Sequence, residues 1–313
     1  MKIGIVGCGA LGCLVAALLK QKAKADVIVV EHAGDRAKKI CQDGLRVEGA
    51  SGSFTVKVAA VSDAKEAGAC DLVIVGVKSY STEDACKDIK ELVGSSTSIL
   101  TMQNGIGNIQ ILNDHFGPEK IVGGVTNHGA TLIGTGHVRH AGKGDTIIGR
   151  SDGRVLGAVR DIAVILTKCG IEAKVSKDID AVIWSKLVVN VGINALTAIA
   201  RLHNGMLLER EECRQVMRSA VQEVVKVVKR KRIKLLYDDP IQKVESVCKL
   251  TSHNVSSMLQ DVLAGKRTEI DFINGAVVRQ AKALNIPTPV NETLTNIVKI
   301  IESNYGNVVT RCV

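Results

Sequence analysis

The stretch that decides the fold of the first half of the chain is "GIVGCGALG", residues 4–12. Gly7, Gly9 and Gly12 have G-x-G-x-x-G spacing, directly after a short apolar run and at the start of a helical pattern. In that context the pattern is typical of a dinucleotide-binding loop, in which the glycines allow a tight turn, a close approach of the pyrophosphate and helix packing. Glycines that merely turn a strand into a helix are the alternative. The expected cofactor contacts in this loop are Gly7, Cys8, Gly9, Ala10, Leu11 and Gly12.

Glu31, at the end of the next apolar run, bears on which cofactor the loop takes. It lies nineteen positions after Gly12, where an acidic residue bonds the adenosine ribose hydroxyls and repels a 2′-phosphate. This favours NADH over NADPH. Basic residues that follow could instead hold that phosphate: His32, Arg36, Lys38 and Lys39. We therefore expect a nicotinamide cofactor, with the choice between the two left open.

Outward from this loop, short apolar runs alternate with helical patterns. The apolar runs lie at 2–7, 26–31, 71–77, 98–100 and 120–126, and the helical patterns at 10–22, 34–43, 81–93 and 107–115. Such alternation predicts a parallel sheet with helices on both faces. Two pieces interrupt it: residues 44–61 suggest short antiparallel strands joined by a Gly/Ser turn, and residues 136–149 suggest a hairpin.

From about residue 177 long helical patterns dominate, and no segment is convincing as a strand. The 313 residues are also enough for two domains. We predict an α/β domain over residues 1–175, a doubly wound sheet of Rossmann type that binds the dinucleotide. An all-α domain over residues 176–313 would carry substrate binding and catalysis.

The chain has a net charge of +9, from 41 basic and 32 acidic residues. This balance suits an anionic small substrate or a phosphorylated cofactor, and it also suits nucleic acid. The densest basic run, "KVVKRKRIK" at 226–234, has no aromatic residues among its charges. A solvated helix end explains it better than contact with nucleic acid or a membrane surface.

The cysteines and histidines give no metal pattern. Nine cysteines are present without a C-x-x-C pair, which argues against zinc and for reduced thiols in a cytosolic chain. His128, His137 and His140 have no recognised ligand spacing, so hydrogen bonding is expected of them. The first residues lead straight into a strand, and no run of eighteen apolar residues occurs. We expect no metal, no membrane span and a cytoplasmic location.

A polar stripe stands out in "IWSKLVVNVGINALTA", residues 183–198. Lys186, Asn190 and Asn194 are spaced by four, so they share one face of a helix that is otherwise apolar. A helix apolar nearly all round is usually buried, and buried polar groups need partners. Either other protein groups satisfy the stripe, with Lys186 at a domain edge, or a ligand does.

Several blocks in order resemble the ketopantoate reductase (2-dehydropantoate 2-reductase) family, in the wider 6-phosphogluconate dehydrogenase-like group. They are "GCGALG" (7–12), "VKSYST" (77–82), "QNGIGN" (103–108), "VTNHGAT" (125–131), "WSKLVVNVGINALTA" (184–198), "SSMLQDVLAGKRTEIDFINGAV" (256–277) and "IPTPVNETL" (286–294). The resemblance implies reduction of 2-dehydropantoate to (R)-pantoate with NADH or NADPH, in pantothenate biosynthesis. One departure is Glu31 or His32, where several NADPH-using members carry an arginine; another is "INALTA" for the commoner "INPLTA".

Carried over by position, the resemblance implies a role for each matching residue. Lys186 would be the general acid, since an alkoxide formed by hydride delivery needs a proton and burial can lower a lysine pKa toward neutrality. Expected substrate contacts are Asn104, Lys186, Asn190, Asn194, Asn204 and Ser257. Further expected cofactor contacts are Lys78, Asn104, Ala130 and Glu269.

The sequence context of some of these residues fits a purely structural role as well. Ser257 lies where helix-capping residues are common, and Glu269 could be a solvated helix charge. Lys78 and Asn104 each follow a strand, and the carboxyl ends of parallel strands are where doubly wound sheets bind ligands. Their functional interpretation therefore stands without the resemblance.

Two other functions stay open beside the leading one. A paralogous reductase would keep the cofactor site but act on another oxo acid. A non-catalytic nucleotide-binding protein would have lost the proton donor, and the presence of Lys186 argues against it. The apolar segments 272–278 and 295–305 could pair in a homodimer or belong to the internal core.

Overall fold

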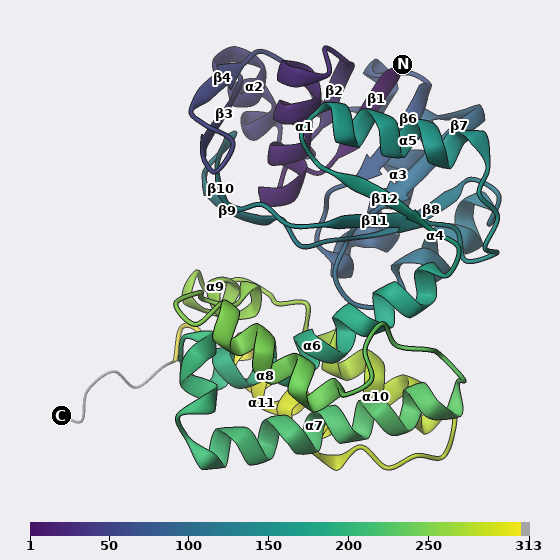
Figure 1. Ribbon diagram of the computed structural model, residues 1–313. Helices are drawn as coiled ribbons and strands as arrows, with labels where there is room; N and C mark the ends of the chain where they lie inside the picture. The colour runs from purple at the N-terminus through teal and green to yellow at the C-terminus, as the bar shows by residue number, and fades with distance from the viewer. Residues whose placement is uncertain (308–313) are drawn as a thin grey trace. The chain divides into compact units, whose positions relative to one another are not determined.

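The computed structural model describes residues 1–307. The chain forms two compact units (Figure 1). The sheet unit comprises Met1–Gln103 and Gly107–Ile179, and the helical unit comprises Asn104–Ile106 and the chain from Asp180 onward. The break after Ile179 lies slightly beyond the expected boundary at residue 175, because the last strand of the sheet unit ends at Ser176. The functional roles assigned to the two domains stay predictions.

The main sheet of the sheet unit has eight strands in the order β12-β11-β8-β7-β6-β1-β2-β5. Their bounds are β1 (Lys2–Val6), β2 (Asp26–Val30), β5 (Ala59–Val61), β6 (Cys70–Val75), β7 (Val93–Thr101), β8 (Ile121–Thr126), β11 (Thr146–Gly149) and β12 (Ala173–Ser176). Neighbouring strands are parallel except β11 and β8, which are antiparallel. The expected parallel sheet is therefore confirmed, with one antiparallel pairing near its edge.

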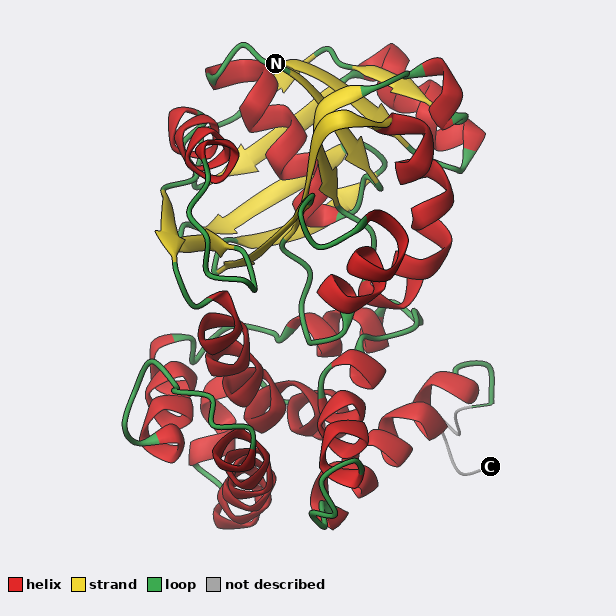
Figure 2. Cartoon of the chain, turned by 90° about the vertical axis from the view of Figure 1, so that its right-hand side faces the viewer, coloured by secondary structure: helices red, strands yellow, loops and turns green. Residues whose placement is uncertain are grey.

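Helices cover both faces of this sheet, as the apolar strands required (Figures 1 and 2). They are α1 (Ala10–Lys22), α2 (Gly34–Asp43), α3 (Thr82–Leu92), α4 (Asn108–Phe116) and α5 (Gly157–Lys168), with short 3₁₀ turns η1 (Ala64–Glu66) and η2 (Ser79–Ser81). Alternate strand residues enter different cores. In β6, Leu72 and Ile74 join the core under α1 and α5, whereas Val73 and Val75 join the core under α3 and α4.

A second, four-stranded sheet has the order β4-β3-β10-β9. Its strands are β3 (Leu45–Gly49), β4 (Phe54–Val56), β9 (Gly129–Gly134) and β10 (His137–Gly142). The antiparallel pair β3–β4 confirms the expectation for the first part of residues 44–61. The remaining strand of that segment, β5, instead pairs with β2 in parallel.

The hairpin expected over residues 136–149 is wrong, because its two strands belong to different sheets. β10 pairs with β9 and β3, whereas β11 pairs with β8 and β12. The physical reason lies in their burial. β10 alternates buried and exposed residues, which suits a sheet with one face in water, while β11 is mostly buried and suits the main sheet.

The helical unit is built around one apolar core, and its described residues from Asp180 to Asn307 include no strand. Its helices are α6 (Ile179–Ala200), α7 (Glu211–Arg230), α8 (Pro240–Leu250), α9 (Ser257–Leu263), α10 (Asn274–Lys282) and α11 (Pro289–Ser303), with 3₁₀ turns η3 (Asn204–Leu208) and η4 (Ile270–Phe272). Val188 and Val191 of α6 are fully buried against Val224 and Val227 of α7 and Val298 of α11. The apolar segments proposed for pairing thus contribute to this internal core.

Two features of the helical unit bear on membrane and nucleic-acid contact. By length and composition α6 could cross a membrane, but 72% of its most apolar window is buried inside the protein, as in the core helix of a soluble protein. The basic run 226–234 covers the end of α7, where Lys226, Lys229 and Arg230 are exposed and the intervening valines are buried. Cations in the last turn also favour the helix dipole.

Candidate active site

The glycine loop has the close backbone packing that its spacing predicted. Gly7 has φ +90°, and a Cβ added there would lie 2.4 Å from a Val77 side-chain carbon. A Cβ at Gly12 would lie 2.2 Å from the Gly7 carbonyl oxygen, so the start of α1 packs directly on the turn. At Gly9, the nearest atom to an added Cβ is the Gly76 carbonyl oxygen at 3.4 Å.

This arrangement leaves Gly9 accessible at the point where α1 begins. Gly9 is the N-cap residue of α1, and no side-chain hydrogen bond caps the helix. The first amide groups of a helix have no partner within it and attract anions. The loop residues therefore fit the pyrophosphate of a dinucleotide, in agreement with the sequence interpretation.

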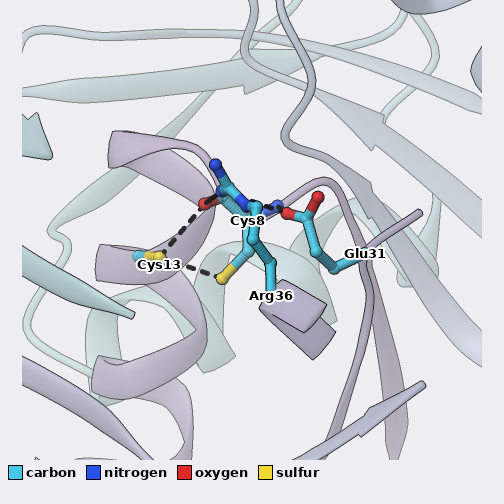
Figure 3. Close-up of polar contacts among 4 residues, drawn as sticks. All are labelled: Cys8, Cys13, Glu31 and Arg36. Carbon is cyan, nitrogen blue, oxygen red and sulfur yellow. Dashed lines mark hydrogen bonds and ion pairs between the residues drawn. The ribbon is translucent and has the colours of Figure 1, made fainter. Parts of the chain in front are cut away.

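Glu31 contacts this loop together with Arg36, one of the four basic residues that the sequence offered as holders of a 2′-phosphate (Figure 3). The Cys8 amide donates to Glu31 Oε2 at 3.2 Å. Arg36 Nη2 donates both to Glu31 Oε2 at 3.2 Å and to the Cys8 carbonyl at 3.1 Å. The Cys8 peptide group is thus held on both sides by one acidic and one basic residue.

The thiols beside this loop are buried and closely packed. Cys8 Sγ and Cys13 Sγ are 2.9 Å apart, and this hydrogen bond together with burial raises the pKa of the Cys8 thiol well above its usual value. Cys8 therefore stays neutral and contributes its peptide group rather than its side chain. Eight of the nine cysteines are free thiols, and Cys312 lies outside the described residues.

Further predicted residues follow the neighbouring strands at the same edge of the main sheet. Lys78 comes after β6 and is partly buried, as the N-cap residue of η2. Gln103, which the sequence analysis missed, follows β7 and donates to the Val77 carbonyl and to Thr82 Oγ1, both at 2.9 Å. It ties the loop that carries Lys78 to the end of β7, and only its position in the "QNGIGN" block marked it.

Ala130 and the three histidines lie near or in the four-stranded sheet. Ala130, in β9, pairs with His140 in β10, and its proposed backbone contact with the cofactor stays a prediction. His140 hydrogen bonds to His128 at 2.9 Å, while His137 lies 2.9 Å from Glu48. Burial lowers the pKa of both His128 and His140. The described residues contain no cluster of three or more His, Cys, Asp or Glu side chains able to hold a metal.

In the helical unit, Lys186 lies on α6 in the predicted stripe with Asn190 and Asn194. Lys186 is partly buried as a residue, and burial lowers the pKa of its ammonium group to about 8, while the charge of Glu269 opposes that shift. A lysine with this pKa is mostly charged at neutral pH and can still release its proton. Asn194 is buried, and Asn190 is partly buried.

Glu269 is buried rather than solvated, at 5% exposure, just before η4. Asn104 Nδ2 donates to Glu269 Oε2 at 3.2 Å. The segment Asn104–Ile106 packs with the helical unit because the Ile106 amide donates to the Phe272 carbonyl at 3.0 Å. These contacts and the electrostatic effect on Lys186 bring three of the predicted residues together.

Asn204 presents a buried acceptor that its surroundings do not satisfy. Its Nδ2 donates to Thr251 Oγ1 at 2.9 Å, and the Thr251 hydroxyl in turn donates to the Val247 carbonyl at 2.7 Å. Because that hydroxyl proton is already used, the amide nitrogen of Asn204 must face Thr251. Asn204 Oδ1 is then left buried with no hydrogen-bond partner among the described residues. A ligand hydroxyl would supply the missing donor.

Ser257 and Ser256 have different roles at the start of α9. Ser256 is the N-cap residue: its hydroxyl is buried, accepts from the Leu259 amide at 3.1 Å and lies 2.7 Å from Thr197 Oγ1 on α6. Ser257 is the first residue of the helix and is exposed. The capping role suggested for Ser257 therefore belongs to its neighbour, which leaves Ser257 accessible to a ligand. The sequence analysis did not single out Ser256 or Thr197.

The fold and these side chains define the class of the protein, a nicotinamide-dependent oxidoreductase with a dinucleotide loop and a lysine of lowered pKa. The chain belongs to the ketopantoate reductase family. The family described as "Ketopantoate reductase PanE/ApbA" matches residues 3–153, and "Ketopantoate reductase PanE/ApbA C terminal" matches residues 178–302.

Individual relatives match along nearly the whole chain. A 2-dehydropantoate 2-reductase of Archaeoglobus fulgidus is 39% identical over 302 residues, covering 96% of this chain and 98% of the relative. Among solved structures, a PanE/ApbA family ketopantoate reductase from Ralstonia eutropha has a TM-score of 0.90 at 32% identity, covering 98% of this chain and all of the other. D-mandelate dehydrogenase, solved with NADH and anilino(oxo)acetate, has a TM-score of 0.92 at 28% identity, covering 98% of this chain and 99% of the other.

Proposed function

We propose that this chain reduces 2-dehydropantoate to (R)-pantoate with a nicotinamide cofactor. This is the reaction for which the family is named, and it is a step of pantothenate biosynthesis. Family membership supports the reaction class, and relatives named for this activity support the substrate. The observation that carries the chemistry is Lys186, whose pKa is lowered to about 8 on a stripe with two neutral amides.

The side chains of the helical unit would each serve one part of the reaction. The nicotinamide, when bound, supplies a hydride to the ketone carbon. Lys186 donates a proton to the ketone oxygen as negative charge develops there, which stabilises the transition state more than the ground state. Asn190 and Asn194 can bond the substrate without adding charge, so they do not hold Lys186 in its charged form. Ser257 would donate to the substrate carboxylate.

The substrate is distinguished from other 2-oxo acids by its hydroxyl group. D-mandelate dehydrogenase, among the similar structures, raises the alternative of a 2-oxo acid without that group. The buried Oδ1 of Asn204 favours 2-dehydropantoate, because a site with an unpaired acceptor rejects an analogue that lacks the matching donor. Asn104 and Glu269 are proposed to lie beside both substrate and cofactor.

We further propose that Glu31 favours NADH, because it directly follows β2, where the adenosine ribose binds in this fold. We also propose that the protein is a homodimer in the cytoplasm. It would have no nucleic-acid or membrane partner. The mostly buried α6 supports the absence of a membrane span. Light scattering during size-exclusion chromatography would give the mass of the protein in solution. A mass equal to one 33.2 kDa chain would contradict the dimer.

The proposed function is tested by the loss of NADH and NADPH absorbance with 2-dehydropantoate and with 3,3-dimethyl-2-oxobutanoate, in which a hydrogen replaces the hydroxyl. We expect rapid oxidation with 2-dehydropantoate and a value of kcat/KM lower by at least about 100-fold for the analogue. Equal rates would remove Asn204 from the substrate site. If the chain binds the cofactor but 2-dehydropantoate does not oxidise it, the substrate is another oxo acid.

A further inference from the structure

The corner of the cofactor site around Glu31 contains a basic residue in a position to act on the adenosine ribose. Glu31 and Arg36 share one contact, and both also hold the Cys8 peptide group (Figure 3). The Glu31 side chain is 13% exposed and that of Arg36 is 36% exposed. The pair is therefore ordered by the protein but can still be reached by a ligand.

The hydrogen bonds of Arg36 leave most of its guanidinium unused. Both of its bonds to described residues run from Nη2, and its Nε is buried without a hydrogen-bond partner among them. A guanidinium has five N–H donors in a planar fork that matches phosphate oxygens. Arg36 is thus anchored at Nη2, its buried Nε is closed to a ligand, and Nη1 has no hydrogen bond to the described residues, so the outer edge of the guanidinium can bind a phosphate.

The other basic residues near Glu31 are engaged or directed elsewhere. His32 Nε2 lies 2.6 Å from an Asp88 carboxylate oxygen. Lys39 forms an ion pair one turn along α2. Lys38 is exposed and lies two residues beyond Arg36 on the same helix, so it projects from a different side. Among the four basic residues that could have held a 2′-phosphate, Arg36 alone contacts Glu31 and the dinucleotide loop.

We propose that Glu31 and Arg36 form a two-way selector for the adenosine ribose, so that the chain binds both NADH and NADPH. Glu31 accepts hydrogen bonds from the ribose hydroxyls of NADH. Arg36 binds the 2′-phosphate of NADPH through its unused donors and offsets the repulsion by Glu31. This inference rests on the proposed function for its cofactor class and adds the residue that sets cofactor specificity.

The test measures the Kd of NADH and of NADPH by calorimetry in the absence of any oxo acid. For the unaltered chain we expect the two values to differ by less than about tenfold, because one charge-assisted contact opposes the other. Arg36→Met should weaken the binding of NADPH by about 10- to 100-fold and the binding of NADH by less than about threefold. Glu31→Gln should weaken NADH and strengthen NADPH.

Two further variants separate phosphate binding from other roles of Arg36. Lys38→Met removes the same charge from the same helix and should change both Kd values by less than about threefold. Arg36→Lys keeps the charge without the fork and should restore part of the NADPH affinity. An equal loss of both cofactors in Arg36→Met, or a selective NADPH loss in Lys38→Met, would overturn the proposal. Since no oxo acid is present, failure of the proposed reaction would leave these results unaffected.

Discussion

At the scale of single residues, two opposing effects set the pKa of Lys186 and so its charge. Burial lowers its pKa, and the buried carboxylate of Glu269 pulls it back, with the result at about 8. Glu269 is itself held by Asn104. The neutral amides at Asn190 and Asn194 add hydrogen-bonding capacity without adding charge. This set is suited to a group that must carry a proton at neutral pH and release it in the reaction.

The Lys186 assignment predicts a particular pH dependence. A general acid acts in its protonated form, so kcat/KM for ketone reduction should be level below about pH 8 and fall as the pH rises through the pKa of Lys186, about 8. Lys186→Ala should lower kcat by about 10²- to 10⁴-fold and abolish that decline. Nucleotide binding, measured by calorimetry, should survive. Nearly unchanged turnover in the variant would show that another group donates the proton.

At the scale of elements, the junction of β1 and α1 shows why the three glycines are not equivalent. Gly7 and Gly12 are required by the protein itself, because added side-chain atoms would collide with Val77 and with the Gly7 carbonyl. Gly9 has space for a methyl group in the protein alone. Its small size therefore serves the ligand that approaches the loop.

This difference predicts opposite behaviour for two matched substitutions. Gly9→Ala should lower the melting temperature by less than about 4 °C, because the site has room for a methyl group and a φ of −72°, and only the preference for glycine over alanine at a helix N-cap is lost. The same change should weaken NADH binding by at least about tenfold. Gly12→Ala should lower the melting temperature by several degrees, because the collision at 2.2 Å is with backbone. The measurements are thermal unfolding and cofactor titration. Equal destabilisation by both would contradict separate roles.

At the scale of the whole molecule, each unit has its own apolar core. The cores around Leu14 and Ile89 draw on the sheet unit, and the core around Val191 draws on the helical unit. Each unit is within the size range of domains that fold alone. Trp184 is the only tryptophan, and it is buried in the helical unit. Its fluorescence therefore reports on one unit.

Separate cores predict unfolding in two steps. Trp184 fluorescence should follow one transition, and calorimetry should show a second that fluorescence does not follow. NADH at a hundred times its Kd should raise the midpoint temperature of the second transition by about 5–10 °C, because the dinucleotide loop lies in the sheet unit. The midpoint of the Trp184 transition should rise less. A single transition that both methods report, with one shift on adding NADH, would contradict this prediction.

The order of elements and the positions of many candidate site residues on those elements could be predicted from sequence because they depend on local periodicity and on motif spacing. The glycine loop, the strand before it and the stripe on α6 all follow such patterns. The pairing of β10 and β11 does not, because both segments look like strands and only competition for buried neighbours assigns them to different sheets. Gln103, Ser256 and Thr197 carry no distinctive spacing, and their contacts appear only when distant segments meet.

The sequence by itself determined the class of cofactor, the two structural classes along the chain and the polar stripe with Lys186, since each rests on residues close together in the chain. Only the tertiary structure decided the balance of burial against Glu269 at Lys186, the orientation of the Asn204 amide and the contact of Arg36 with Glu31. These three depend on burial and on the remaining hydrogen-bonding capacity of neighbouring groups. Both quantities are set by packing between segments, which no local pattern records.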